Sequence, residues 1–138
     1  MKRIVLDTNC LIQMLSRRSP FYAVWQAYQK EQFALCVSND ILTEYREIIG
    51  QKATPEIAEN VVSLILHHPL TELFDPKFRF GFITQDVDDN KFVDCAIVAN
   101  AQYIVSDDAH FEELKQLPPE FQIEVLKLQE FLQTFTSM

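Results

Sequence analysis

Four acidic residues from distant parts of the chain are the side chains best suited to do chemistry. Asp7 and Asp108 each follow a short apolar run. Glu44 lies in an apolar helical pattern, and Asp89 belongs to an acidic stretch that begins at Asp86. Carboxylates brought together repel one another unless a cation lies between them. Because hard oxygen ligands suit Mg²⁺ or Mn²⁺, the sequence predicts a divalent-metal site if the fold gathers these acids.

Metal ions held by such a cluster would activate water for attack on a phosphate ester. A bound divalent ion polarises a phosphoryl oxygen and lowers the pKa of its coordinated water towards neutrality. A pair of such ions would lie roughly 3.5–4 Å apart and would bind both the attacking and the leaving oxygen. Each acid taken alone predicts only a helix cap or a surface residue. The joint pattern is what indicates a catalytic site.

The elements that must position the acids alternate between strands and helices. A helix is expected over Cys10–Leu15 with Thr8 or Asn9 as its cap, and Ser19-Pro20 is typical of a helix start. The Ser38-Asn39-Asp40 segment predicts a helix that runs through Ile49 and stops at Gly50. Further helices are predicted over 55–67, from 89 onward, near 109–114 and over 128–135, and strands over 3–6, 33–37, within 70–83, before Ser106 and over 123–125.

This alternation predicts one α/β domain over residues 1–138. Its core would be a central parallel sheet of about four to five strands between helical layers, in a three-layer α/β/α arrangement. Continuous apolar runs such as Arg3–Leu6 are typical of strands buried on both faces. Functional sites in such folds form at the carboxyl ends of the strands, and Asp7 and Asp108 are both expected there.

Composition narrows the functional classes further. The formal net charge is −8, which counts against a simple nucleic-acid-binding module but not against an enzyme that binds phosphates through metal ions. The three cysteines lie in apolar context, and their odd number argues against a disulfide framework. The apolar run at the start of the chain is too short for a signal peptide. No apolar run in the sequence approaches the length needed to span a membrane. We therefore expect a soluble cytoplasmic protein without a membrane partner.

The acidic segments resemble, in order and in spacing, the motifs of the PIN-domain ribonucleases. Ile4–Asn9 is similar to the opening strand and Asp-Thr-Asn signature of that family, and Val37–Tyr45 resembles the segment that carries its second acid. Asp86–Ala96 is similar to the family's acidic helix start, and Ile104–Asp108 resembles its Val-Thr-x-Asp strand end. The resemblance covers nearly all of the first 111 residues and is greatest to the stand-alone, VapC-like toxins of toxin–antitoxin pairs.

This resemblance implies a parallel sheet between helices and Mg²⁺- or Mn²⁺-dependent cleavage of RNA. It also implies a cognate antitoxin protein that covers the acidic site, and a homodimer. The metal-binding and catalytic roles fall on four residues of this chain: Asp7, Glu44, Asp89 and Asp108.

Some positions leave alternatives open. Asp94 rivals Asp89 as the third acid, and since the two do not share a helical face we expect Asp89 to be the ligand and Asp94 an auxiliary acid. The Ser-x-Asp pattern favours Asp108 over Asp107. Family members often carry another acid two residues later, where this chain has His110. That histidine could contact phosphate or donate a proton, but a surface histidine without such a role is the expectation.

The remaining candidates are supporting residues and competing functions. Asn9 and Ser106 could orient metal ligands or water, although capping and turn bonding explain them equally well. Arg17, Arg18 and Lys91 are near enough in sequence to the acids to contact phosphates, although most such cations are simply solvated. A catalytically weak PIN-fold module that binds RNA or protein is the main alternative to a ribonuclease, and a phosphohydrolase with Asp7 as nucleophile is a weaker one. The presence of all four main acids favours the ribonuclease.

Overall fold

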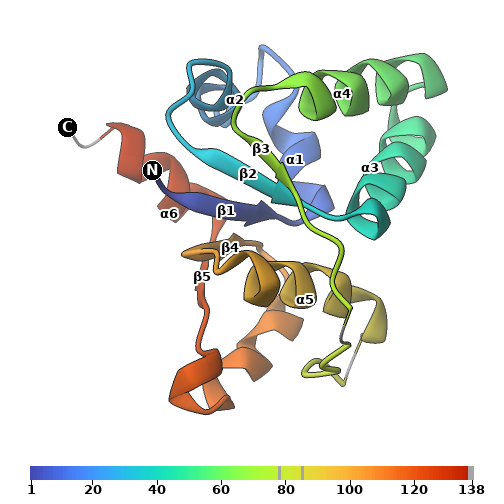
Figure 1. The fold of residues 1–138 in the computed structure, drawn as a ribbon. Coiled ribbons are helices and arrows are strands. Elements are labelled where there is room, and N and C mark those ends of the chain that lie inside the picture. The colour runs from blue at the N-terminus through green and yellow to red at the C-terminus, as the bar shows by residue number, and fades with distance from the viewer. Residues whose placement is uncertain (78, 85, 137–138) are drawn as a thin grey trace.

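The computed structural model describes residues 1–77, 79–84 and 86–136. Its centre is a five-stranded sheet with the strand order β3-β2-β1-β4-β5, in which every neighbouring pair is parallel (Figure 1). The prediction of a parallel sheet between helices is confirmed. The strands are β1 (Arg3–Leu6), β2 (Ala34–Val37), β3 (Thr71–Leu73), β4 (Tyr103–Val105) and β5 (Glu124–Leu126).

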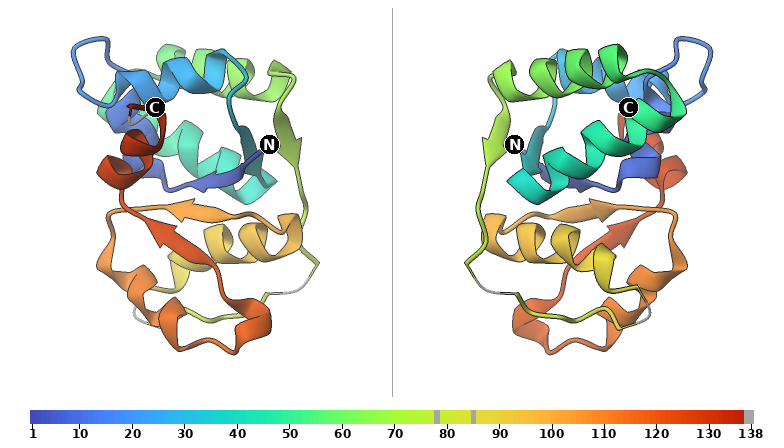
Figure 2. Two further views of the ribbon diagram at one scale, coloured as in Figure 1. Left: turned by 90° about the vertical axis from the view of Figure 1, so that its left-hand side faces the viewer. Right: turned by 90° about the vertical axis from the view of Figure 1, so that its right-hand side faces the viewer.

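Helices cover the sheet on both sides and complete a three-layer α/β/α fold. In Figure 2, the C-terminal helix α6 lies in front of the sheet in the left view, whereas α3 and α5 lie in front of it in the right view, which shows the opposite face. Helix α5 packs against β1, β2 and β4, and the C-terminal helix α6 packs against α2. The helices are α1 (Thr8–Met14), α2 (Tyr22–Gln29), α3 (Asn39–Lys52), α4 (Pro55–His67), α5 (Asn90–Ala99) and α6 (Leu128–Thr136), with short 3₁₀ helices η1 (Val87–Asp89), η2 (Ala109–Gln116) and η3 (Pro119–Phe121).

The register of the two central strands brings distant segments together at the carboxyl edge of the sheet. Leu6 of β1 pairs with Val105 of β4. The next residue on the first strand, Asp7, donates its backbone N–H to the Val105 carbonyl at 3.0 Å. The residues that follow β1 and β4 are therefore neighbours in space, although about a hundred positions separate them in the chain.

Local capping signals account for several helix starts. The Ser38 side chain accepts a hydrogen bond from the Ile41 N–H and begins α3, and Thr54 does the same for Ile57 at the start of α4. Three sequence expectations about helix ends were wrong. Helix α1 begins at Thr8 with Asp7 at the cap position, α2 begins at Tyr22 rather than at Ser19-Pro20, and α3 runs past Gly50 to Lys52.

The core is continuous across the sheet and ties α3 to β1. The strands β1 and β2 are almost wholly buried, as expected for central parallel strands. Tyr45 of α3 is fully buried, and its hydroxyl donates to the Leu6 carbonyl at 2.6 Å. This bond anchors the helix that carries Glu44 to the strand that ends at Asp7. The cysteines at positions 10, 36 and 95 are buried and free.

Among the described residues, no helix is both long and apolar enough to cross a membrane.

Replacing Tyr45 with phenylalanine tests this anchor. The change removes one buried hydrogen bond while keeping the ring, so it should lower the free energy of unfolding by about 1–2 kcal/mol. Urea denaturation should show a lower midpoint with an unchanged m-value. The matched change Tyr103→Phe, at a partly exposed ring, should cost no more than about 0.5 kcal/mol. Equal losses in the two variants would contradict the anchoring role.

Candidate active site

The four acids identified in the sequence meet at the carboxyl edge of the sheet. Asp7 follows β1, Asp108 follows β4, Glu44 lies on α3, and Asp89 ends η1 where α5 begins. Burial raises the pKa of Asp7, and the carboxylates of Glu44 and Asp108 act in the same direction. Burial also raises the pKa of Asp89, to about 6, and Asp108 and Asp7 add to that effect. Asp7 is thus close enough to Glu44, Asp108 and Asp89 for their charges to affect one another. Among the described residues, the ligand atoms that lie within 4.8 Å of one another are those of Asp86, Asp89 and His110, so the four predicted acids do not form such a group.

Ser106 connects the two strand ends. Its hydroxyl donates to Oδ2 of Asp7 at 2.8 Å and accepts the Asp108 N–H at 3.0 Å. Both Ser106 and Asp7 are buried, so this hydrogen bond partly offsets the desolvation of the Asp7 carboxylate. Ser106 therefore has the geometry of a residue that orients Asp7, as its place after β4 suggested.

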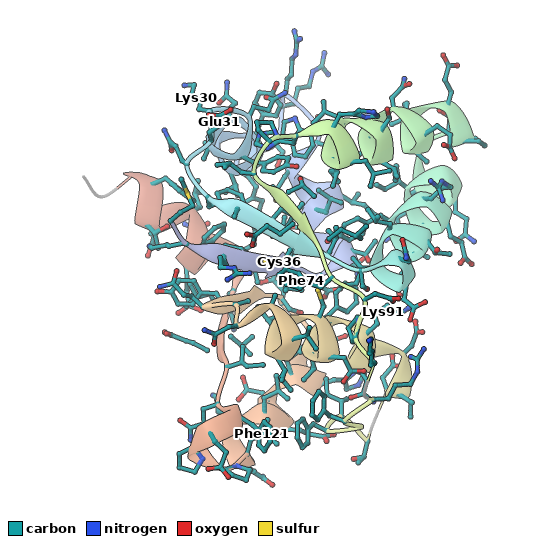
Figure 3. All side chains as sticks on the ribbon, in the orientation of Figure 1. Lys30, Glu31, Cys36, Phe74, Lys91 and Phe121 are labelled. Carbon is teal, nitrogen blue, oxygen red and sulfur yellow. The ribbon has the colours of Figure 1, made fainter. Side chains whose placement is uncertain are left out.

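Glu44 is held by a hydroxyl and by an ammonium group. The Thr8 hydroxyl donates to Oε2 of Glu44, and the Lys91 ammonium lies 2.8 Å from Oε1. Lys91 also lies 2.9 Å from Oδ1 of Asp88. Its side chain, labelled in Figure 3, is only 16% exposed. Burial by itself lowers the pKa of Lys91, but its two acidic partners outweigh burial and raise it. The expectation of a solvated cation was wrong.

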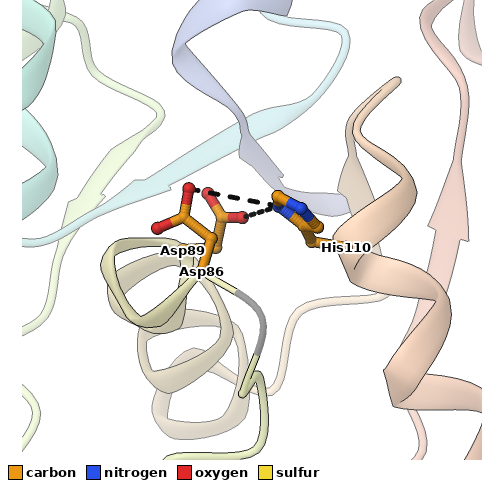
Figure 4. A group of neighbouring side chains, drawn as sticks. All are labelled: Asp86, Asp89 and His110. Carbon is orange, nitrogen blue, oxygen red and sulfur yellow. Dashed lines mark hydrogen bonds and ion pairs between the residues drawn. The ribbon is translucent and has the colours of Figure 1, made fainter.

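His110 lies among three carboxylates. Its Nδ1 is 3.2 Å from Oδ2 of Asp89, 3.2 Å from Oδ1 of Asp108 and 4.0 Å from Oδ2 of Asp86. Figure 4 shows the histidine from η2 facing Asp86 and Asp89, which lie at the start of η1 and α5. The hydrogen bond to Asp89 raises the pKa of His110. The histidine is therefore paired with carboxylates, and the prediction that it neither contacts phosphate nor donates a proton stays a prediction.

Asp86 was missed as a separate site residue by sequence reasoning. One of its oxygens caps η1 by accepting the Asp88 N–H at 3.1 Å. Its three-residue spacing from Asp89 is the signal that could have identified it, since one turn of a 3₁₀ helix places such residues on the same side. The ligand atoms of Asp86, Asp89 and His110 all lie within 4.8 Å of one another.

Asp107 and Asn9 make contacts outside the cluster of four acids. Oδ1 of Asp107 accepts the Leu128 N–H at 3.1 Å at the start of α6. Oδ1 of Asn9 accepts a hydrogen bond from the Lys52 ammonium at 3.2 Å. Both side chains still line the same shallow hollow as Asp7, which places them beside the cluster.

Asp94 lies one turn further along α5 and has a different environment. It is buried, and its Oδ1 accepts the Phe80 N–H at 3.1 Å. Burial raises the pKa of Asp94, while the Phe80 hydrogen bond and the charge of Arg79 act in the opposite direction. With Glu44 it lines a groove of about 580 Å³ between α3 and the segment before α5. Its contacts indicate that it holds the 79–84 segment in place.

The donor set fits a divalent metal ion. Carboxylates supply the oxygen ligands that such ions prefer, and His110 adds an imidazole nitrogen. The raised pKa of Asp89 reflects burial first, and then repulsion from Asp108, Asp86 and Asp7. A divalent cation among these groups would remove that repulsion and keep the carboxylates ionised.

Comparison with known proteins gives a family and a fold. A family model described as a PIN domain matches residues 3–110. The solved VapBC2 from Rickettsia felis, bound to a DNA fragment from its promoter, matches with a TM-score of 0.62 and 15% identity over 91% of this chain and 98% of that one. VapBC-1 from nontypeable Haemophilus influenzae matches with a TM-score of 0.62 and 13% identity, over 92% of this chain and 98% of that one.

The PIN domain endonuclease Utp24 matches with a TM-score of 0.56 and 14% identity, over 91% of this chain and 84% of that chain. At these identities the structural likenesses establish the fold, in agreement with the parallel sheet described above. No curated protein matches the sequence.

Metal binding should stabilise the protein measurably. At a free ion concentration of about 100 times Kd, a ligand that binds only the folded state adds about 2.7 kcal/mol of stability. Mn²⁺ should therefore raise the melting temperature, and excess EDTA should reverse the rise. Asp89→Asn should abolish most of the shift, whereas Glu59→Gln, at an exposed acid paired with Arg46, should leave it intact. A shift of the same size in Asp89→Asn would place the ion elsewhere.

Proposed function

This chain belongs to the PIN-domain family, and from that premise we propose that it is a metal-dependent ribonuclease that hydrolyses RNA phosphodiester bonds. The observation that carries the proposal is the convergence of Asp7, Glu44, Asp89 and Asp108 on one edge of the sheet, where their charges affect one another. Membership of the family supports nuclease activity in general. The choice of RNA as substrate and of Mg²⁺ or Mn²⁺ as cofactor is part of the proposal.

Each side chain has a role that follows from its contacts. A divalent ion bound by Asp7, Asp89 and Asp108 would polarise a phosphoryl oxygen and activate water near neutral pH. Ser106 orients the Asp7 carboxylate by donating to it, and Thr8 orients Glu44.

The two cations that contact the acids also have roles. The ammonium of Lys91 places a positive charge beside the acids, where it can contact a phosphate oxygen. His110 is 35% exposed, so its ring can exchange a proton with solvent or with a leaving group.

We further propose that the protein acts as the toxin of a toxin–antitoxin pair. The similar folds of VapBC2 and VapBC-1 support a protein partner. The net charge of −8 and the acidic groove beside Glu44 suit a basic segment of that partner. A homodimer is proposed by analogy with the family, and light scattering that reports only a monomer would remove it.

A catalytically weak binding module is the second candidate. The observation that favours it is that Glu44 already contacts the Lys91 ammonium, while Asp89 and Asp108 contact His110, which is a cation when protonated. Such internal ion pairs would compete with a metal ion and reduce turnover. Rapid metal-dependent cleavage by a low concentration of protein would exclude this candidate.

Substitution of single acids separates these proposals. Asp7→Asn should reduce cleavage of a mixed RNA panel at least about a hundredfold, which corresponds to a loss of about 2.7 kcal/mol of transition-state stabilisation. Asp89→Asn should have a similar effect, because both carboxylates would hold the ion. Cleavage is measured with Mg²⁺, with Mn²⁺ and with EDTA, and circular dichroism checks that each variant is folded.

Asp94→Asn is the informative comparison for the third acid. Because Asp94 bonds to the Phe80 N–H, the change should lower thermal stability more than it lowers the rate of cleavage. Glu59→Gln controls for the loss of one negative charge at a distant exposed position. Full activity in folded Asp7→Asn protein would reject the nuclease mechanism. A greater loss of cleavage in Asp94→Asn than in Asp89→Asn would make Asp94 the third metal-binding acid in place of Asp89.

A further inference from the structure

The environment of His110 bears on which metal ion the site takes. We propose that His110 is a metal ligand and that, with Asp86 and Asp89, it makes the site select a transition ion such as Mn²⁺ over Mg²⁺. The inference rests on the proposed metal-dependent function, which by itself leaves the ion open. It concerns one nitrogen and two carboxylates, drawn together in Figure 4.

The separations between the ligand atoms suit a shared ion. Two ligands that are each about 2.1 Å from one ion can be at most roughly 4.2 Å apart. Nδ1 of His110 lies 3.2 Å from Oδ2 of Asp89 and 4.0 Å from Oδ2 of Asp86, within that limit. An ion in this position would replace the hydrogen bond that now joins His110 to Asp89.

Nearby contacts fix the position of the imidazole while leaving it reachable. The backbone N–H of His110 donates to Oδ1 of Asp108 at 2.9 Å. The next residue, Phe111, is buried and packs its ring against Phe92. The His110 side chain nevertheless stays 35% exposed, so an ion can enter from solvent. A ligand held in this way loses little conformational freedom when the ion binds.

The chemistry of the donor set then gives the selectivity. Mg²⁺ demands oxygen ligands in near-ideal octahedral geometry and retains several of its waters. Imidazole nitrogen is a softer donor that suits transition ions, whose affinity for such sites rises from Mn²⁺ to Cu²⁺. A site of two carboxylates and one imidazole should therefore bind Mn²⁺ much more tightly than Mg²⁺.

A different role for His110 makes the opposite prediction. If the histidine were only a counter-ion for Asp86, Asp89 and Asp108, it would compete with any cation. Its removal would then strengthen the binding of Mg²⁺ and Mn²⁺ to a similar extent, because both ions carry the same charge. A ligand role and a counter-ion role are therefore distinguished by the direction of the change as well as by its size.

The test measures ion binding to the complete protein in the absence of RNA. Isothermal titration with Mn²⁺ and with Mg²⁺ should show at least about tenfold tighter binding of Mn²⁺ to the unaltered protein. His110→Ala should weaken Mn²⁺ binding at least about tenfold and change Mg²⁺ binding much less. His67→Ala, at an exposed histidine that bonds to the Ser63 carbonyl on α4, is the matched control and should change neither.

A spectroscopic measurement reads the ligand directly. Pulsed electron paramagnetic resonance of the Mn²⁺-loaded protein should detect a coupled imidazole nitrogen that disappears in His110→Ala and persists in His67→Ala. If His110→Ala does not fold, Asp86→Asn provides the second variant, and it should weaken Mn²⁺ binding while the nitrogen coupling remains in the residual complex. Absence of nitrogen coupling in the unaltered protein, or equal strengthening of both ions in His110→Ala, would overturn the proposal.

The outcome is independent of the nuclease assay. If Asp7→Asn abolishes cleavage but the protein shows no preference for Mn²⁺ and no nitrogen coupling, the ribonuclease proposal stands and the role of His110 fails. If Mn²⁺ binds through His110 but RNA is not cleaved, the metal site stands and the activity fails.

Discussion

The burial of several carboxylates close to one another, at one edge of the sheet, is the constraint on which the rest of this structure depends. Parallel pairing of β1 with β4 places Asp7 beside the segment that ends at Asp108, and α3 and α5 bring two further acids to the same edge. Burial is the main reason that the pKa of both Asp7 and Asp89 is raised, and the neighbouring carboxylates raise it further because they oppose one another's ionisation. The fold tolerates this cost because neighbouring donors offset part of it.

Those donors are distributed so that each of the four acids contacts at least one of them. Ser106 donates to Asp7, Thr8 and Lys91 donate to Glu44, and His110 contacts Asp89 and Asp108. Lys91 is a cation and His110 becomes one when it is protonated, so the chain can adopt this arrangement before any metal ion binds. The same cations bring positive charge to an otherwise acidic protein at the place where a phosphate would have to approach.

The parts of the fold that could be predicted are those that depend on short stretches of sequence, such as apolar runs and helix-capping residues. The buried strand before Asp7, the helix start at Ser38 and the parallel sheet implied by alternation all follow from short-range rules. Gly50 was misjudged as a helix stop because an interior glycine costs a helix only about 1 kcal/mol, which tertiary packing can offset. The structure shows this packing, with Gly50 lying against Pro55 and Ala58 of the next helix.

The site was predictable in outline and not in its contacts. The four acids could be identified because each follows a strand or lies near a helix start, and the register of the sheet then brings them together. The partnerships of Lys91 and His110 depend on side chains that reach across space between α3, α5 and η2. The periodicity of the sequence does not indicate which side chains from different elements come into contact. Asp86 escaped notice for the same reason, since its closeness to His110 arises only when η1 and η2 meet.

The central claim is that these acids form one metal site, and the most direct measurement is anomalous X-ray scattering from crystals of the protein soaked in Mn²⁺. The account predicts a strong anomalous peak at the carboxyl edge of β1 and β4, within coordination distance of Asp89 and at least one of its acidic neighbours. A peak elsewhere on the surface, or none while the Lys91 and His110 ion pairs remain intact, would contradict it.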